Sequence, residues 1–176
     1  MRRDDWRLLL TYLPSLIIAA ALLGVLIWRL WPAPERISGE ELYQAHFVPY
    51  PNVVAPIDRD VPAQERSLRE HAYQAYESYD YGQADILLAK LPASDTTQFY
   101  RGMIAMIKDR FAQARSFLSP LAEEEGEAFH EAGEWYEALL LLREEKLNAA
   151  RRRLEMIASE PSHPFLERAQ RLLDDM

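Results

Sequence analysis

The chain has 176 residues, a mass of 20.4 kDa and a formal net charge of −8 at pH 7. It contains no cysteine, which excludes thiol nucleophiles, disulfides and cysteine-ligated metal centres. The acidic balance argues against nucleic-acid binding, which needs clustered Lys and Arg to neutralise phosphates. An average hydrophobic content of 49% conceals a concentration of apolar residues near the N-terminus.

The first feature along the chain is an uncharged run of 21 residues from Leu8 to Trp28. A helix of about 20 apolar residues crosses the hydrocarbon core of a bilayer. A cleaved signal peptide has a shorter apolar region followed by small residues, whereas this run ends in Trp28-Arg29-Leu30-Trp31-Pro32. We therefore predict a retained transmembrane helix over residues 8–31, embedded in the lipid bilayer. A buried core helix is the alternative.

The basic residues around this run predict its orientation. Arg2, Arg3 and Arg7 precede it, and Arg29 and Arg36 follow it closely. Because Lys and Arg favour the cytoplasmic side, we expect residues 1–7 to form a short cytoplasmic N-terminus. The chain is then a single-pass protein of the inner membrane, with its C-terminal domain in the periplasm.

Residues 32–64 contain six of the chain's 11 prolines and are predicted to form an extended linker and docking segment. One helical turn is expected near residues 40–47, with Ser38 as its N-cap and Glu41 in the capping-box position. The apolar stretch at 47–57 needs a surface to pack on. That surface is either its own domain or a partner groove that recognises polyproline-type conformation. The docking residues are Phe47, Pro49, Tyr50, Pro51 and Asn52.

Residues 65–176 are predicted to form a domain of helical repeats. Residues 37–176 hold 15 Lys and Arg against 25 Asp and Glu, a net charge of −10. Ala84, Ala114 and Ala150 are 30 and 36 residues apart and anchor three similar segments. A small residue lies 12 positions before each anchor, and large apolar residues lie 3 before and 4 after it. Small residues let paired helices approach closely, and large ones fill the space between pairs.

This pattern resembles the tetratricopeptide repeat, a helix–turn–helix unit of 34 residues. It implies an all-α fold: an N-terminal transmembrane helix, about three repeats stacked as an α-solenoid, and a C-terminal capping helix within 163–173. A plain helical bundle is the alternative. The segment Phe47-Val48-Pro49-Tyr50-Pro51-Asn52 and the ending around Trp135-Tyr136-x-Ala138 resemble a family of bacterial single-span membrane-anchored tetratricopeptide proteins.

The resemblance also implies a concave groove lined by the first helix of each repeat. Counted from the anchor alanines, the groove residues are Arg69, Tyr73, Tyr76, Phe99, Met103, Met106, Trp135 and Leu139. Aromatic residues, Met and Arg are common in protein-binding surfaces. We expect a protein or peptide partner, or the chain's own segment at 47–57, to cover this strip.

No residue pattern predicts an enzyme, a cofactor or a metal site. The four histidines lack metalloprotease spacing, the glycines form no phosphate-binding loop, and no serine lies in a nucleophile elbow. The run from His130 to Glu134 is interpreted as an ordinary acidic helix face. The sequence thus favours a membrane-tethered scaffold or adaptor for protein–protein interaction. The alternatives are an accessory subunit held through its transmembrane helix and a periplasmic ligand-binding module.

Overall fold

The computed structural model describes residues 20–21, 23–26, 29, 37–54, 63–126 and 128–176. The chain divides into two compact units, Met1–Arg36 and Ile37–Met176. In the first unit the described residues are helical. No helix in the described part of the chain has both the length and the apolarity needed to cross a membrane. The predicted cytoplasmic residues 1–7 and most of the predicted span at 8–31 lie outside the described residues.

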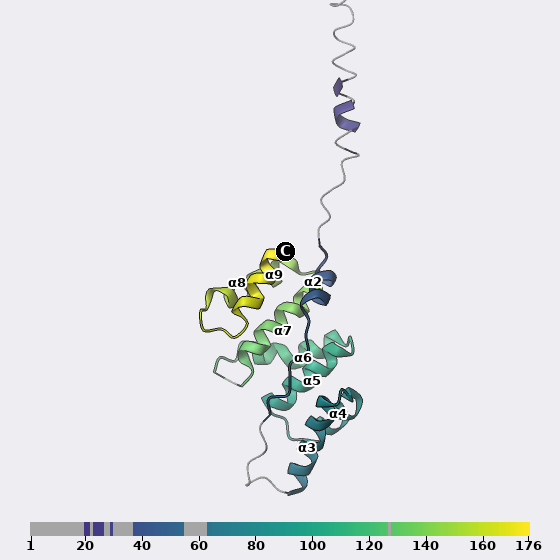
Figure 1. The fold of residues 1–176 in the computed structure, drawn as a ribbon, viewed down its shortest axis with the longest axis vertical. Helices are drawn as coiled ribbons and strands as arrows, with labels where there is room; N and C mark the ends of the chain where they lie inside the picture. Colours follow the sequence, from purple (N-terminus) through teal and green to yellow (C-terminus); the bar gives the residue numbers. More distant parts are fainter. Residues whose placement is uncertain (1–19, 22, 27–28, 30–36, 55–62, 127) are drawn as a thin grey trace, which may run out of the picture. The chain divides into compact units, whose positions relative to one another are not determined.

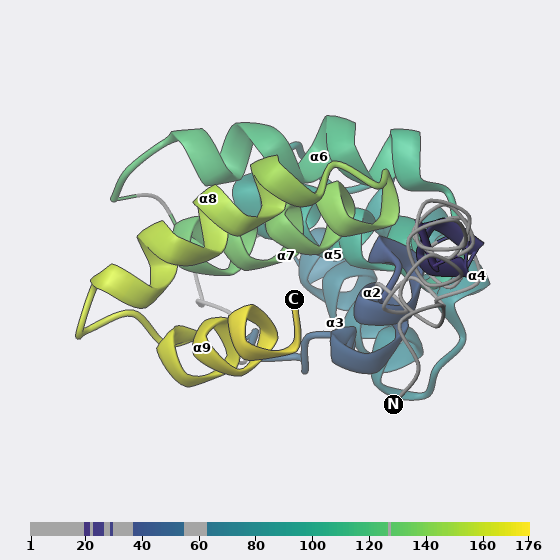
Figure 2. The same ribbon diagram turned by 90° about the horizontal axis from the view of Figure 1, so that it is seen from above.

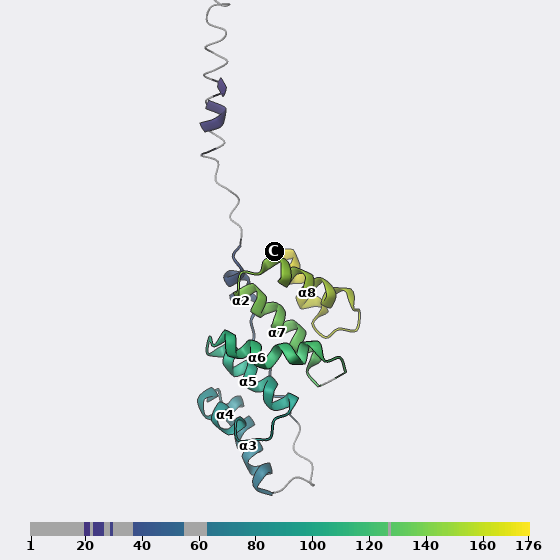
Figure 3. The same ribbon diagram turned by 180° about the vertical axis from the view of Figure 1, so that it is seen from behind.

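Every regular element described in the second unit is a helix, as expected for an all-α fold. The helices are α2 (Gly39–His46), α3 (Ala63–Glu77), α4 (Tyr81–Leu88), α5 (Asp95–Ile107), α6 (Phe111–Glu123), α7 (His130–Arg143), α8 (Leu147–Ser159) and α9 (Leu166–Asp175). In the described residues they form consecutive helical hairpins, α3–α4, α5–α6 and α7–α8, with α9 packed against α8. Figures 1 and 3 show this succession from the front and from behind.

The same tight turn joins the two helices of each hairpin. The residue after the helix cap is left-handed in every case, with φ of 62° at Tyr79, 55° at Asp109 and 56° at Glu145. The next amide N–H then reaches back to a carbonyl five residues earlier, as from Asp80 to Ala75 at 2.9 Å. This is the Schellman arrangement, which satisfies carbonyls that the helix end leaves open. The repeat in the sequence is thus a repeat of local backbone structure.

The small residues of the repeat lie where paired helices approach most closely. The predicted anchors Ala84, Ala114 and Ala150 are fully buried, with an exposed fraction of 0%. At Gly102 in α5, a Cβ atom would lie 2.7 Å from side-chain carbons of Leu118 in α6. A larger residue there would push the helices apart. The sequence-based reason for these small residues is therefore confirmed within the described hairpins.

The last helix and α2 cover the end of the domain. Figure 2 shows α6 and α8 along one side of the stack and α9 on the other. The buried face of α9 carries Ala169 and Leu172, which pack into the core. Helix α2 packs on α7 and α9 and buries Leu42 and Tyr43. Residues 37–54, placed in the linker by the sequence analysis, thus belong to the domain because their apolar side chains pack on it.

Candidate interaction groove

An extended segment, residues 47–54, crosses the first helices of the hairpins. We call it the strap. In Figure 1 it runs from α2 past α7 and α5 towards α3. A tyrosine hydroxyl from each of these helices donates a hydrogen bond to a strap carbonyl. The pairs are Tyr136 with Val48 at 2.7 Å, Tyr76 with Tyr50 at 2.7 Å and Tyr100 with Pro51 at 3.0 Å. These three bonds contact the backbone of the strap and not its side chains.

The far end of the strap is held by further polar contacts. The Tyr100 hydroxyl also accepts a hydrogen bond from the Val53 amide at 2.9 Å, so it is both donor and acceptor. The Asn52 side-chain amide donates to Glu77 Oε1 at 2.7 Å, and Asn52 Oδ1 accepts from the Val54 amide at 3.0 Å. The predicted docking residue Asn52 therefore fixes the strap both to α3 and to its own backbone.

Aromatic side chains anchor the strap in the core. The Tyr50 ring meets Phe99 at a centroid distance of 5.1 Å and an interplanar angle of 87°. The Phe47 ring stacks on Tyr43 of α2 at 5.1 Å and meets the edge of Tyr136 at 6.2 Å. Edge-to-face and offset stacked pairs are the favoured aromatic geometries. Of the remaining docking residues, Pro49 and Pro51 are exposed.

The predicted groove residues are buried within the domain. Arg69 keeps partial exposure, whereas no more than 5% of each of the others is exposed: Tyr73, Tyr76, Phe99, Met103, Met106, Trp135 and Leu139. From the sequence, we expect an apolar strip that a partner or residues 47–57 cover. Residues 47–54 of the chain contact Tyr76 and Phe99 of this strip, whereas Trp135 stacks on Phe165 at a centroid distance of 5.5 Å. Residues 55–57 lie outside the described residues. The physical reason is that a small domain gains core volume by burying such a strip itself.

Two of the strap-binding tyrosines are absent from the predicted groove set. Tyr100 and Tyr136 directly follow the predicted residues Phe99 and Trp135. Both lie 14 positions before an anchor alanine, since 114 − 100 and 150 − 136 are equal. A search for identical residues at equal repeat positions would have found this pair.

Burial keeps these tyrosines protonated. Burial raises the pKa of Tyr100 to about 12, although the hydrogen bond from the Val53 amide acts in the opposite direction. Burial also raises the pKa of Tyr76 and of Tyr136 well above the ordinary value of 10.0. An ordinary tyrosine is already protonated at neutral pH, so the raised pKa values keep the three hydroxyls as hydrogen-bond donors in alkaline solution as well.

The start of α2 is fixed by the third hairpin turn. Its left-handed residue, Glu145, accepts hydrogen bonds from the amides of Gly39 at 3.1 Å and Glu40 at 3.2 Å. The carboxylate thus lies at the positive end of the α2 dipole, and Glu40 also pairs with Arg143. A Cβ atom at position 39 would overlap the Leu142 carbonyl oxygen, so this contact requires glycine. Helix α2 is therefore held against α7, and this contact positions the strap, which follows α2 in the chain.

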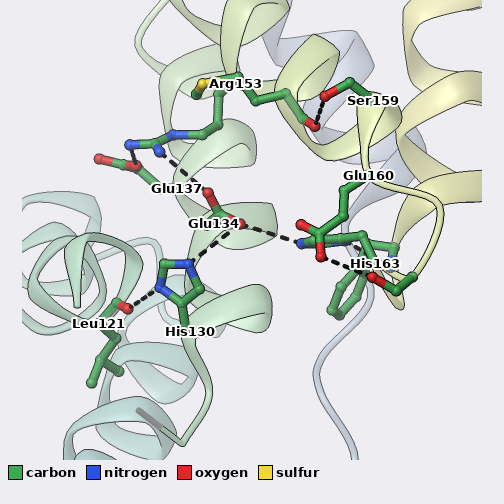
Figure 4. A network of polar contacts seen from close by, with 11 residues as sticks. Leu121, His130, Glu134, Glu137, Arg153, Ser159, Glu160 and His163 are labelled. Atoms are coloured by element: carbon green, nitrogen blue, oxygen red, sulfur yellow. Dashed lines mark hydrogen bonds and ion pairs between the residues drawn. The ribbon is translucent and has the colours of Figure 1, made fainter. Parts of the chain in front are cut away.

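A second polar cluster joins α7, α8 and the loop before α9 (Figure 4). Glu134 of α7 lies 3.4 Å from Arg153, 3.4 Å from His163 Nε2 and 3.7 Å from His130 Nε2. Arg153 also pairs with Glu137. His163 Nδ1 accepts a hydrogen bond from the Phe165 amide at 3.1 Å. The proton of a neutral His163 therefore resides on Nε2, which faces Glu134.

This cluster holds the end of the domain together. The His163 side chain has 0% exposure, and His130 Nδ1 lies 3.1 Å from the Leu121 carbonyl at the end of α6. No group of three or more metal-ligand side chains was found among the described residues. The sequence predicts only an acidic helix face at His130 and Glu134, and it does not reveal that Glu134 also meets His163 and Arg153. The spacing of four residues, which places His130 and Glu134 on one helix face, signals only the contact between these two.

No protein-family model matches this chain, and no curated protein and no solved structure matches it significantly.

Proposed function

We propose that this chain is a membrane-tethered adaptor for protein–protein interaction, anchored by residues 8–31 with residues 37–176 on the periplasmic side. One observation carries the proposal. The hairpins hold an extended segment through hydroxyl-to-carbonyl hydrogen bonds from Tyr76, Tyr100 and Tyr136. These bonds join the hairpins and the strap into one domain, and an all-helical domain of stacked hairpins offers exposed surface for protein recognition. The resemblance to tetratricopeptide proteins supports the same function.

The filled groove shapes the proposed mechanism. The strap occupies the groove, so the groove itself is not open to a partner. A partner therefore binds the surfaces of the domain that stay exposed around the strap. The membrane anchor keeps this platform near membrane proteins, and tethering raises the effective concentration of a partner. No chemical step is needed for this function.

Co-purification of the full-length protein from crosslinked native membranes tests the proposal. We expect a protein partner in a fixed ratio to the chain. The control replaces residues 8–31 by an unrelated apolar sequence of equal length. This change leaves the domain intact, and we expect the variant to retain the partner. Loss of the partner in this control would favour an accessory subunit held through its span. A wild-type protein that purifies without a partner would contradict the adaptor function.

A further inference from the structure

A cavity of about 380 Å³ lies between the strap and the first hairpin turn. Its aromatic walls come from the end of α3, the turn itself and the start of α4, at Tyr76, Tyr79 and Tyr81. Glu77 of α3 supplies a carboxylate, and the strap closes the cavity with Pro49 and Pro51. Neither the groove contacts nor the Glu134 cluster involves Tyr79 and Tyr81.

The rings in this cavity stand at steep angles to one another. The Tyr81 ring lies 5.4 Å from Tyr76 at an interplanar angle of 71°, and 6.1 Å from Tyr79 at 80°. Both pairs are edge-to-face contacts rather than flat stacks, and all three rings line the cavity. The face of an aromatic ring carries negative potential and attracts a cation within about 6 Å of its centroid.

Tyr79 places a large aromatic ring at the left-handed position that each hairpin turn repeats. Its φ of 62° is left-handed, a position where helices usually end in Gly or Asn. The residue is 78% exposed, so the large ring gains little from burial in its own domain. Asp109 and Glu145 hold the same position in the other two hairpin turns, so the left-handed backbone belongs to the turn, and the exposed ring is what distinguishes Tyr79. A large aromatic ring that its own domain leaves exposed beside a cavity fits a residue that contacts another molecule.

The charge of the cavity favours a cation. Asn52 donates to Glu77 Oε1 and is a neutral partner, so it leaves the negative charge of Glu77 in place. The unit from 37 to 176 has a net charge of −10, from 15 Lys and Arg and 25 Asp and Glu. Such a surface draws cations towards it and repels anions. The high exposure of Tyr79 leaves the cavity mouth open to a group presented by another protein surface.

We propose that this cavity binds the cationic end of a Lys or Arg side chain from the partner protein. The rings of Tyr79 and Tyr81 face the cation, and the Glu77 carboxylate neutralises it. This inference rests on the proposed adaptor function and assigns to it the site and the chemistry of the partner.

A peptide titration tests the cavity directly. The full-length protein in detergent micelles is labelled with 3-fluorotyrosine, and resonances are assigned by single Tyr→Phe substitutions. Acetylated and amidated Gly-Lys-Gly and Gly-Arg-Gly should shift the Tyr79 and Tyr81 resonances, whereas Gly-norleucine-Gly should not. We expect Tyr79→Leu to weaken binding of the Lys peptide by about three- to tenfold, and Glu77→Gln to weaken it by about threefold.

The variants separate charge from structure. Glu77→Gln keeps an oxygen that accepts the Asn52 amide and removes only the charge. Tyr79→Phe keeps the ring and should retain binding. Glu125→Gln removes an exposed carboxylate that does not line the cavity, and it should leave the affinity unchanged. If Glu125→Gln and Glu77→Gln weaken binding equally, the loss of affinity comes from the overall charge of the domain, and the assigned site is overturned.

Other outcomes also overturn the inference. An equal response to the norleucine peptide would show an apolar pocket. Binding of tetramethylammonium without binding of the Lys or Arg peptide would show a small-molecule ammonium site. Full-length Tyr79→Leu that co-purifies with the partner as well as wild type would remove this cavity from the interface and leave the adaptor function standing. A wild-type protein without any partner would reject that function whatever the peptides do.

Discussion

Single hydroxyl groups connect the strap to the helices. Each of Tyr76, Tyr100 and Tyr136 places one polar atom among buried aromatic rings and directs it at a carbonyl. A buried carbonyl that loses its donor incurs a desolvation penalty. The strap thus depends on hydroxyls that a simple apolar pattern does not distinguish from phenylalanine rings. This is why the sequence predicted an aromatic strip but not the partners of its hydroxyls.

Replacing Tyr136 by Phe should destabilise the domain. The substitution removes the donor to the Val48 carbonyl, at 2.7 Å, and keeps the ring in the core. We expect the free energy of unfolding to fall by about 1–2 kcal/mol, measured by chemical denaturation of the full-length protein. Tyr79→Phe, at a ring 78% exposed, is the matched control and should change stability by less than about 0.5 kcal/mol. Equal stability of both variants would contradict the role assigned to the hydroxyl.

Alkaline pH should loosen the strap through Tyr100. Its folded pKa is raised to about 12 from an ordinary 10.0, so folding favours the protonated hydroxyl. The stability from this group is complete below pH 10 and is lost as pH rises towards 12. Within that window we expect the free energy of unfolding to fall by about 1.4 kcal/mol per pH unit for this group. Tyr100→Phe should show a shallower slope in denaturation measured across pH 9 to 12, and an unchanged slope would contradict the assignment.

The strained turn residue Tyr79 should trade stability for binding. Asn adopts left-handed backbone more readily than Tyr, so Tyr79→Asn should stabilise the domain by about 0.5 kcal/mol and weaken binding of the Lys peptide. Thermal unfolding and the fluorotyrosine titration measure the two effects, the latter at Tyr81. A less stable variant would show that contact between Tyr79 and Tyr81 outweighs the backbone strain.

At the scale of elements, the sequence predicts the hairpins more completely than it predicts the packing of residues 37–54, which precede them in the chain. The anchor alanines and the Ser38 capping box correctly predicted close helix pairs and the short helix α2. Those features depend on residues near one another in the sequence. The clamp from Glu145 to Gly39 spans more than 100 residues, and no local pattern predicts it. The meeting of Glu134 with His163 was missed for the same reason.

Two glycines in the first turns of helices should respond oppositely to alanine. Gly39→Ala places a methyl group against the Leu142 carbonyl and should cost about 1–3 kcal/mol by displacing α2. At Gly82 the nearest atoms would lie 3.6 Å and 3.7 Å from a Cβ, which is ordinary contact. Gly82→Ala should therefore stabilise α4 by about 0.5 kcal/mol. Denaturation of both variants provides the comparison, and a neutral Gly39→Ala would contradict the clamp.

At the scale of the whole molecule, the strap is a part of the domain and not a spacer. Helix α2 and residues 47–54 complete the core that the hairpins leave open. The apolar residues of this segment predict that it needs a surface, but they leave open whether that surface belongs to the chain or to a partner. The answer depends on long-range hydrogen bonds to Tyr76, Tyr100 and Tyr136, which appear only in three dimensions. We therefore propose that the partner binds outside the groove, at the cavity lined by Tyr79, Tyr81 and Glu77.

Hydrogen exchange of the Val53 amide in the full-length protein tests the filled groove most directly. This amide donates to the Tyr100 hydroxyl at 2.9 Å, and both Pro49 and Pro51 lack an amide N–H. We expect Val53 to exchange far more slowly than an unfolded chain in the wild type, and to lose this protection in Tyr100→Phe while core amides of α5 stay protected. Exchange of wild-type Val53 at the unfolded rate, with α5 still protected, would contradict a strap bound in the groove.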